Sequence, residues 1–167
     1  MNTRFNWYKY GPHSGAFSLI ELLAVISIVA ILVGLSLSSL QHLLQRYHFM
    51  VMRDRLWHAL YYTKSLAILG DRTLILCGSR DGVQCSQDWR YQWLIYDVAY
   101  QRVVHHFKFG YLASLTVQWH GNQSQRPGVL FDHFGETGGQ QGRFDIKLGF
   151  YHAQIVLISS GRMRMVS

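Results

Sequence analysis

The sequence predicts an α+β fold in which one long N-terminal helix packs on a C-terminal antiparallel β-sheet domain. Residues 16–40 are apolar or small apart from one charge, Glu21. Residues 41–69 contain no proline or glycine and space their apolar side chains by three and four, as one face of a helix does. After Gly70 apolar and polar residues alternate, which is the period of a β-strand. These observations divide the chain into a helix and a β-rich domain over residues 70–167.

The helix begins with an apolar segment that is long enough to cross a bilayer. About 20 apolar residues span roughly 30 Å of hydrocarbon, so residues 17–40 are predicted to be transmembrane. Arg4 and Lys9 precede this segment without any acidic residue, which orients the N-terminus toward the cytoplasm. A carboxylate such as Glu21 costs on the order of 2.5–3.5 kcal/mol inside a span, which favours a functional residue with a partner. The alternative is a charge near the helix end that reaches the lipid headgroups.

Residues 41–69 are predicted to continue the helix as an amphipathic segment. The apolar side chains of its predicted face are Leu40, Leu43, Leu44, Tyr47, Val51, Leu56, Ala59, Leu60 and Ala67. Gly70 follows the last periodic residues, so we expect the helix to stop there. This segment is expected to lay its apolar face on the β-rich domain.

The β-rich domain is predicted to contain eight short strands. Runs rich in Val, Ile, Tyr, Trp and Phe alternate with turns that contain Gly, Asn and Pro, as in antiparallel sheets. The predicted strands cover residues 72–77, 91–98, 101–109, 115–119, 128–132, 143–148, 153–158 and 162–166. Two polar, glycine-containing linkers, residues 121–127 and 135–142, are expected to be mobile.

Cys77 and Cys85 are the two cysteines of the chain. The predicted orientation places them outside the cytoplasm, where disulfides persist. The seven residues between them include two glycines and an Asp-Gly step, which favour a turn. A metal site or a catalytic cysteine is less favoured because the usual companion ligands are missing. We therefore predict a structural disulfide.

The segment around Glu21 resembles the prepilin motif of type IV pilins and type II secretion pseudopilins. The residues that carry this resemblance are Gly15-Ala16-Phe17-Ser18-Leu19-Ile20-Glu21-Leu22, after a short basic leader. The resemblance implies that prepilin peptidase removes residues 1–16 and methylates the new N-terminus at Phe17. The cut then follows Ala16, and a cut after Gly15 is the alternative. Glu21 becomes the fifth mature residue, which in such proteins meets the amino terminus of the neighbouring subunit during filament assembly.

This resemblance also implies where the chain is found. It is expected to be a single-pass protein of the inner membrane with its C-terminal domain in the periplasm. It is then expected to enter a pilus filament at the cell surface, where other pilins and minor pilins are its partners.

Features farther along the chain resemble the FimT/GspH group of minor pilins and pseudopilins. They include the helix end over residues 56–68, the Cys77 and Cys85 pair, the strand Trp93-Leu94-Ile95-Tyr96 and the C-terminal Gly161-Arg162-Met163-Arg164. In this group the resemblance implies one of two functions. The first is a minor type IV pilin that binds DNA for uptake in natural transformation. The alternative is a minor pseudopilin of type II secretion with a structural role, and plain adhesion or pilus priming is a weaker third.

The segment Gly161-Arg162-Met163-Arg164 favours the DNA-binding function. Residues two apart on a strand project to the same face, so Arg162 and Arg164 point the same way with Cα atoms about 6.6 Å apart. Two guanidinium groups at this spacing are able to address neighbouring backbone phosphates. Gly161 permits a tight turn before them. The segment resembles the Gly-Arg-x-Arg tail of DNA-binding FimT proteins, whereas the alternative is an edge strand whose arginines discourage aggregation.

Charge and composition are compatible with an anionic partner. The chain has 16 Lys and Arg against 9 Asp and Glu, and from Gln101 onward there are 7 basic and 3 acidic residues. Arg143 and Lys147 follow a glycine-rich loop and are candidates to extend the DNA contact. We expect binding to the phosphate backbone without sequence preference.

No catalytic motif is recognisable in the sequence. His105 and His106 are adjacent, so on a strand they point to opposite faces and make a poor metal site. The sequence contains no His-Glu-x-x-His, phosphate-binding loop or Gly-x-Ser-x-Gly motif. We therefore predict a protein that is not an enzyme and needs no metal or cofactor.

Overall fold

The computed structural model describes residues 18–110, 114–123 and 126–166, without the side chains of residues 35–39. The chain divides into two compact units, residues 1–41 and residues 42–167. Ala16 and Phe17, the predicted processing site, lie outside the described residues.

One helix, α1, covers Leu19–Leu69, close to the predicted bounds. Ser18 caps its N-terminus, because the Ser18 Oγ and C=O both accept the Glu21 backbone N–H, at 3.3 and 3.1 Å. Ser18 and Glu21 thus have the spacing of a capping box, and the Glu21 carboxylate lies in the first turn, where the helix dipole favours a negative charge. This local role for Glu21 was not predicted.

Helix α1 ends at Leu69, and Gly70 follows it as predicted. Asp71 takes the left-handed conformation, with a φ of 47°. The Arg72 N–H donates to the Ala67 C=O and the Asp71 N–H donates to the Ile68 C=O, the bond pair of a Schellman motif. Aspartate is one of the few residues with a side chain that tolerate this conformation.

The first unit contains the N-terminal part of α1. Its described apolar side chains, from Leu19 to Val33, are exposed. Within the part of the chain that the structure describes, no helix is long and apolar enough to cross a membrane.

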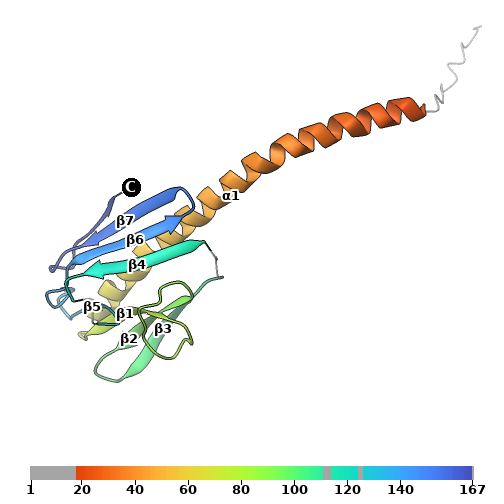
Figure 1. Cartoon of the computed structure of the whole chain (residues 1–167). Coiled ribbons are helices and arrows are strands. Elements are labelled where there is room, and N and C mark those ends of the chain that lie inside the picture. Colours follow the sequence, from red (N-terminus) through yellow and green to blue (C-terminus); the bar gives the residue numbers. More distant parts are fainter. Residues whose placement is uncertain (1–17, 111–113, 124–125, 167) are drawn as a thin grey trace, which may run out of the picture. The chain divides into compact units, whose positions relative to one another are not determined.

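The second unit contains two four-stranded antiparallel sheets (Figure 1). All eight predicted strands are present. Sheet A has the order β3-β2-β1-β5, and sheet B has the order β4-β6-β7-β8. The strands of sheet A are β1 (Leu74–Ser79), β2 (Gln92–Asp97), β3 (Arg102–Lys108) and β5 (Gly128–Phe131). The strands of sheet B are β4 (Leu115–Gly121), β6 (Gly142–Leu148), β7 (Tyr151–Leu157) and β8 (Met163–Val166).

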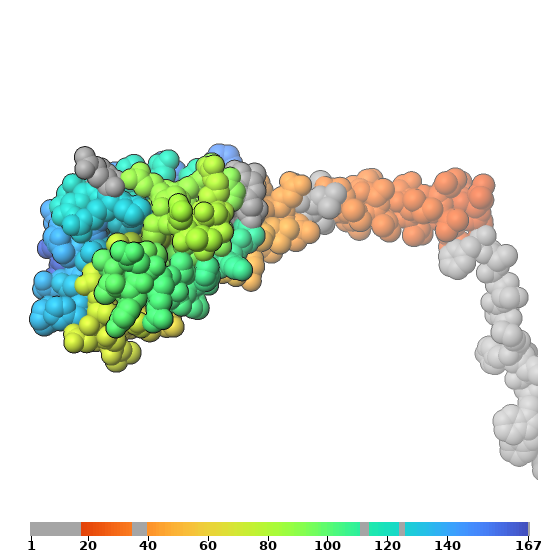
Figure 2. All heavy atoms as spheres, turned by 90° about the horizontal axis from the view of Figure 1, so that it is seen from below, coloured from red at the N-terminus to blue at the C-terminus, as the bar shows by residue number. Residues whose placement is uncertain are grey.

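Both sheets share one hydrophobic core with residues 49–67 of α1. Figure 2 shows one face of this unit, on which residues 70–110, in yellow to green, lie beside later residues in cyan and blue. The helix contributes Phe49, Met52, Leu56, Ala59, Leu60 and Ala67. The predicted apolar face is therefore right from Leu56 onward, whereas its earlier members Leu40, Leu43, Leu44 and Tyr47 are exposed.

The linker over residues 135–142 is held in place by buried polar side chains, contrary to the expected mobility. Thr137 and Gln140 are fully buried. The Gln140 side chain accepts the Leu130 N–H at 2.8 Å and donates to the Gly128 C=O at 3.1 Å. A side-chain amide thus satisfies backbone groups of β5 in the way that a neighbouring strand does.

Candidate nucleic-acid interface

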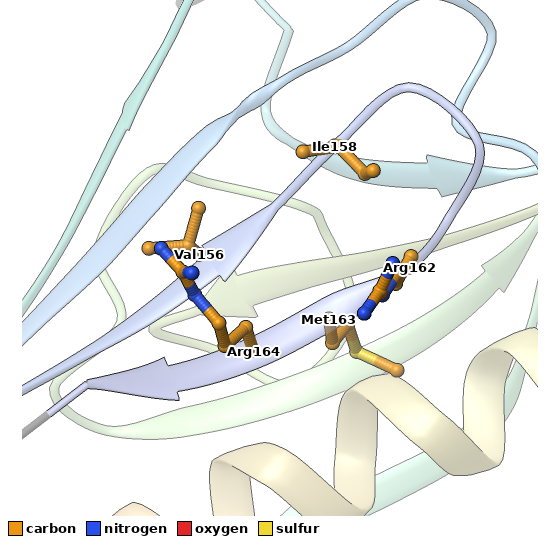
Figure 3. Close-up of a pocket in the computed structure, with 5 residues that line it drawn as sticks. All are labelled: Val156, Ile158, Arg162, Met163 and Arg164. Atoms are coloured by element: carbon orange, nitrogen blue, oxygen red, sulfur yellow. The ribbon is translucent and has the colours of Figure 1, made fainter.

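Arg162 and Arg164 lie at one edge of sheet B. β8 pairs with β7 alone in this sheet, and its residues alternate between half-buried Met163 and Met165 and exposed Arg164. Arg162 stands just before β8 and is exposed as well. Figure 3 shows both arginines as the sequence predicts them, on one side of the strand. Since β8 is an edge strand, its arginines also suit the alternative role of discouraging sheet-to-sheet contact.

A shallow groove of about 290 Å³ accompanies these arginines. Its lining consists of Val156, Ile158, Arg162, Met163 and Arg164. The groove combines two guanidinium groups with apolar side chains of the neighbouring strand, and Figure 3 places Val156 beside Arg164. A cationic rim over an apolar floor suits the phosphate and sugar of a nucleic-acid backbone.

The turn before the arginines is anchored to the rest of the domain. The Gly161 N–H donates to the Ile158 C=O at 2.9 Å, and the Lys64 Nζ of α1 donates to the Gly161 C=O at 2.9 Å. The Thr137 N–H and hydroxyl both donate to the Ser159 C=O, at 2.9 and 3.0 Å. The direction in which Arg162 leaves this turn is therefore set by contacts with two distant segments.

Gly161 is required by this packing. It has a φ of 69°, and a Cβ added there lies 1.8 Å from the backbone oxygen of Gly135. Gly161, predicted as one of the DNA-binding residues, is buried in the turn, whereas Arg162 and Arg164 are exposed.

Arg143 and Lys147 lie on the same face of sheet B as Arg164. Strand pairing puts His120, Arg143, Val156 and Arg164 in one row across the four strands. Lys147 lies four residues farther along β6, opposite His152 of β7. Phe144 and Ile146, which alternate with these residues, point into the core. We name this solvent-facing side of β4, β6, β7 and β8, together with Arg162, the basic face.

Asp145 lies in the middle of the basic face and is its one acidic residue among the described parts of these strands. The Arg143 Nε and the Gln154 Nε2 donate to its carboxylate, at 3.4 and 2.8 Å. Burial raises the pKa of Asp145, but the hydrogen bond and positive charge of Arg143 and the bond from Gln154 outweigh it, so the pKa lies below its ordinary value. The basic face thus carries four cationic side chains and one carboxylate that stays ionised.

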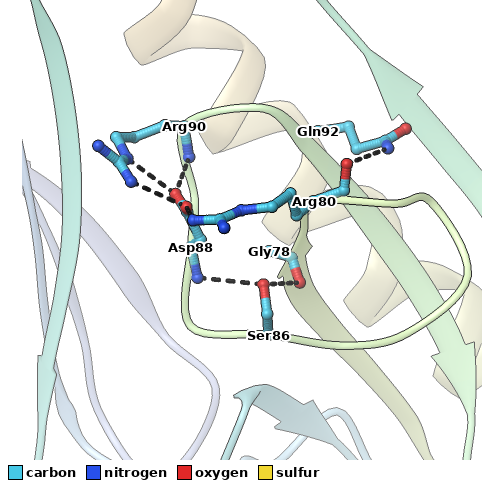
Figure 4. Close-up of polar contacts among 6 residues, drawn as sticks. All are labelled: Gly78, Arg80, Ser86, Asp88, Arg90 and Gln92. Carbon is cyan, nitrogen blue, oxygen red and sulfur yellow. Dashed lines mark hydrogen bonds and ion pairs between the residues drawn. The ribbon is translucent and has the colours of Figure 1, made fainter.

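The predicted disulfide between Cys77 and Cys85 is confirmed. It closes the loop between β1 and β2, which contains a second charged cluster (Figure 4). Asp88 accepts bonds from Arg80 Nη2 at 3.1 Å and from Arg90 Nε and Nη2 at 2.9 Å. The side-chain bond from Arg90 contributes most to a pKa of Asp88 well below its ordinary value, against the opposing effect of burial. This cluster orders the loop through contacts within the domain.

The sequence did not predict the roles of Lys64, Thr137, Asp145, His120 and His152. Asp145, His120 and His152 follow the alternation of β6, β4 and β7. Once the strand pairing is known, this alternation places them on the same face as Arg143 and Lys147. The Lys64 and Thr137 contacts join segments that are distant in sequence, and no local pattern predicts them.

Comparison with known proteins bears on both units. Residues 12–37 match the family described as the prokaryotic N-terminal methylation motif. No curated protein sequence matches the chain.

Two crystal structures of the type IV minor pilin FimU of Pseudomonas aeruginosa (strain PAO1) are similar in structure. The crystal in space group P21 has a TM-score of 0.59 and 16% sequence identity, and the match covers 73% of this chain and 90% of FimU. The crystal in space group P65 has a TM-score of 0.51 and 16% identity, covering 68% and 89%. The chain therefore has the type IV pilin fold, with a long N-terminal helix packed on antiparallel sheets.

Proposed function

We propose that this chain is a minor type IV pilin whose C-terminal domain binds DNA without sequence preference for uptake in natural transformation. The methylation motif over residues 12–37 and the fold shared with FimU support the pilin half of this proposal. The single observation that supports the DNA half is the basic face, on which Arg162 and Arg164 are exposed beside Arg143 and Lys147.

The processing and assembly steps follow from the motif. Prepilin peptidase cuts after Ala16 and methylates Phe17, and the apolar start of α1 anchors the chain in the inner membrane before assembly. Glu21, which lies in the first turn of α1, pairs with the amino terminus of a neighbouring pilin. The positive charge of that amino terminus offsets the cost of placing the Glu21 carboxylate in an apolar environment.

The basic face is suited to the DNA backbone. The phosphates of one DNA strand follow each other at about 3.4 Å along the axis, a spacing commensurate with residues two apart on a strand. Forked guanidinium groups bind phosphate oxygens with charge-assisted hydrogen bonds. Contacts of this kind carry affinity and salt dependence, and they carry no sequence information.

The test is a fluorescence titration of the full chain, in a neutral detergent, with unrelated duplexes at several salt concentrations. The wild type is expected to bind all duplexes alike. Arg162→Ala/Arg164→Ala is expected to weaken binding and to make the salt slope shallower by up to about 1.8, roughly 0.9 per lost phosphate contact. The control is Arg53→Ala/Arg55→Ala, two basic residues on α1, which is expected to leave binding unchanged.

Absence of binding at low salt contradicts the DNA half of the proposal. The arginines are then edge protection, and a structural minor pseudopilin of type II secretion becomes the preferred function. Equal salt slopes for the wild type and the arginine variant place the DNA contact elsewhere on the domain.

A further inference from the structure

Two histidines approach Asp145 from the strands on either side of β6. The Nε2 atom of His120, on β4, lies 3.4 Å from one carboxylate oxygen. The Nε2 atom of His152, on β7, lies 3.6 Å from the other oxygen. The side chains of the two histidines are 52% and 45% exposed, so their outer edges reach solvent on the basic face.

We propose that His120 and His152 are two further DNA-contacting residues, which bind phosphate only when they are protonated. This inference rests on the proposed DNA binding and deepens it, because it makes part of the interface conditional on mildly acidic pH.

The donors of the imidazole ring explain why protonation matters. A neutral imidazole has one N–H, whereas the protonated ring has two. The carboxylate of Asp145 lies near the Nε2 of each ring, so its negative charge favours the neutral tautomer with the N–H at Nε2, in which Nδ1 is an acceptor. An acceptor nitrogen repels a phosphate oxygen. Protonation turns Nδ1 into a donor while Nε2 keeps its contact with Asp145.

The charge of the basic face changes in the same direction. At pH 8 it carries Arg143, Lys147, Arg162 and Arg164 against Asp145, which gives a net charge of +3. Protonation of His120 and His152 raises this charge to +5. Histidine is the side chain type whose charge changes most readily between pH 8 and pH 5.5, a range over which carboxylates are ordinarily ionised.

Other charged groups act on the two rings as well. His120 lies beside Arg143 in the cross-strand row and shares a groove with Arg126. His152 lies directly opposite Lys147. These cations oppose protonation in the free protein and Asp145 favours it. A phosphate that binds between them adds a negative charge, so DNA and protons bind cooperatively on this face.

The experiment measures DNA affinity of the full chain, in a neutral detergent, at pH 8 and pH 5.5 by fluorescence anisotropy with one mixed-sequence duplex. The wild type is expected to bind on the order of 2- to 30-fold tighter at pH 5.5, the range that two exposed ion pairs give. The salt slope is expected to be steeper at pH 5.5 by up to about 1.8.

Two matched variants test whether His120 and His152 cause the tighter DNA binding at pH 5.5. His120→Gln/His152→Gln is expected to keep the affinity at pH 8 and to lose the gain at pH 5.5. The control His58→Gln/His106→Gln removes two exposed histidines of α1 and β3 and is expected to keep the gain.

The remaining outcomes contradict either this inference alone or this inference together with the proposed function. If the wild type binds DNA equally at both pH values, or if the His120 and His152 variant keeps the gain, this inference is wrong while DNA binding through the arginines stands. If the wild type binds DNA at neither pH, the proposed function and this inference are both wrong.

Discussion

At the scale of single residues, Gly161 shows how a position in the middle of a candidate binding motif is used for packing. Its carbonyl accepts the Lys64 Nζ, and its Cα lies against the Gly135 backbone. Arg162 and Arg164 depend on this residue for their position, because the turn over residues 158–161 leads directly into β8.

Substitution Gly161→Ala tests this dependence. The positive φ and the clash with the Gly135 oxygen are expected to lower the free energy of unfolding by roughly 1–3 kcal/mol, and more if the turn cannot shift. Urea unfolding followed by tryptophan fluorescence measures the change. Ser160→Ala, at an exposed position of the same turn, is the control and is expected to have little effect. Unchanged stability of Gly161→Ala contradicts the structural role.

At the scale of elements, the sequence predicted strands better than it predicted their pairing. Alternation specifies which face of a strand is buried, and it predicted all eight strands within a few residues. Alternation does not specify partners, so the division into two sheets and the cross-strand row through Arg143 and Arg164 required the structure. The basic pair of β6 was predicted, but its relation to Asp145 was not.

Two other details of the structure were not predicted from the sequence. Residues 135–142 have the composition of a mobile linker, yet the buried amide of Gln140 serves as a partner for β5. At the end of α1, Gly70 follows the last helical residue as predicted, and Asp71 takes the left-handed conformation. Both outcomes depend on tertiary contacts or on a conformation that several residue types are able to adopt.

The disulfide loop provides a pH-dependent prediction. Asp88 has a pKa below its ordinary value, so its ion pairs stabilise the fold above pH 4 and this contribution is lost as the pH falls through the folded-state pKa. Asp88→Asn is therefore expected to lower the free energy of unfolding by roughly 1 kcal/mol at pH 7, since both arginine partners are partly exposed.

The difference between the wild type and Asp88→Asn is expected to shrink as the pH falls below about 4. Urea unfolding at pH 7, 5 and 3 measures it. Asp54→Asn, whose carboxylate is half exposed on α1, is the control and is expected to have a smaller effect at pH 7. A difference for Asp88→Asn that is constant over this pH range contradicts the ionic role of Asp88.

At the scale of the whole molecule, helix α1 contributes residues to both compact units. Among the described residues, the buried apolar side chains begin at Phe49, and the apolar side chains of α1 over residues 19–34 and 40–48 are exposed. A long helix of this kind suits a protein that carries an apolar segment for a membrane or a filament and a domain with its own core. The second half of the predicted apolar face is buried, whereas Leu43, Leu44 and Tyr47 are exposed although they belong to the second unit.

The independence of the second unit is open to a direct test. A fragment of residues 42–167 retains every core residue and is expected to unfold cooperatively in urea, with the same midpoint as this unit in the full chain in a neutral detergent. A fragment of residues 53–167 lacks Phe49, which stacks on Tyr151 at 5.7 Å, and also lacks Met52. Loss of these buried side chains is expected to cost several kcal/mol, by analogy with about 2–5 kcal/mol for each large-to-small core substitution. Equal stability of the two fragments contradicts the assignment of Phe49 and Met52 to the core, and an unfolded 42–167 fragment shows that the N-terminal unit is needed for folding.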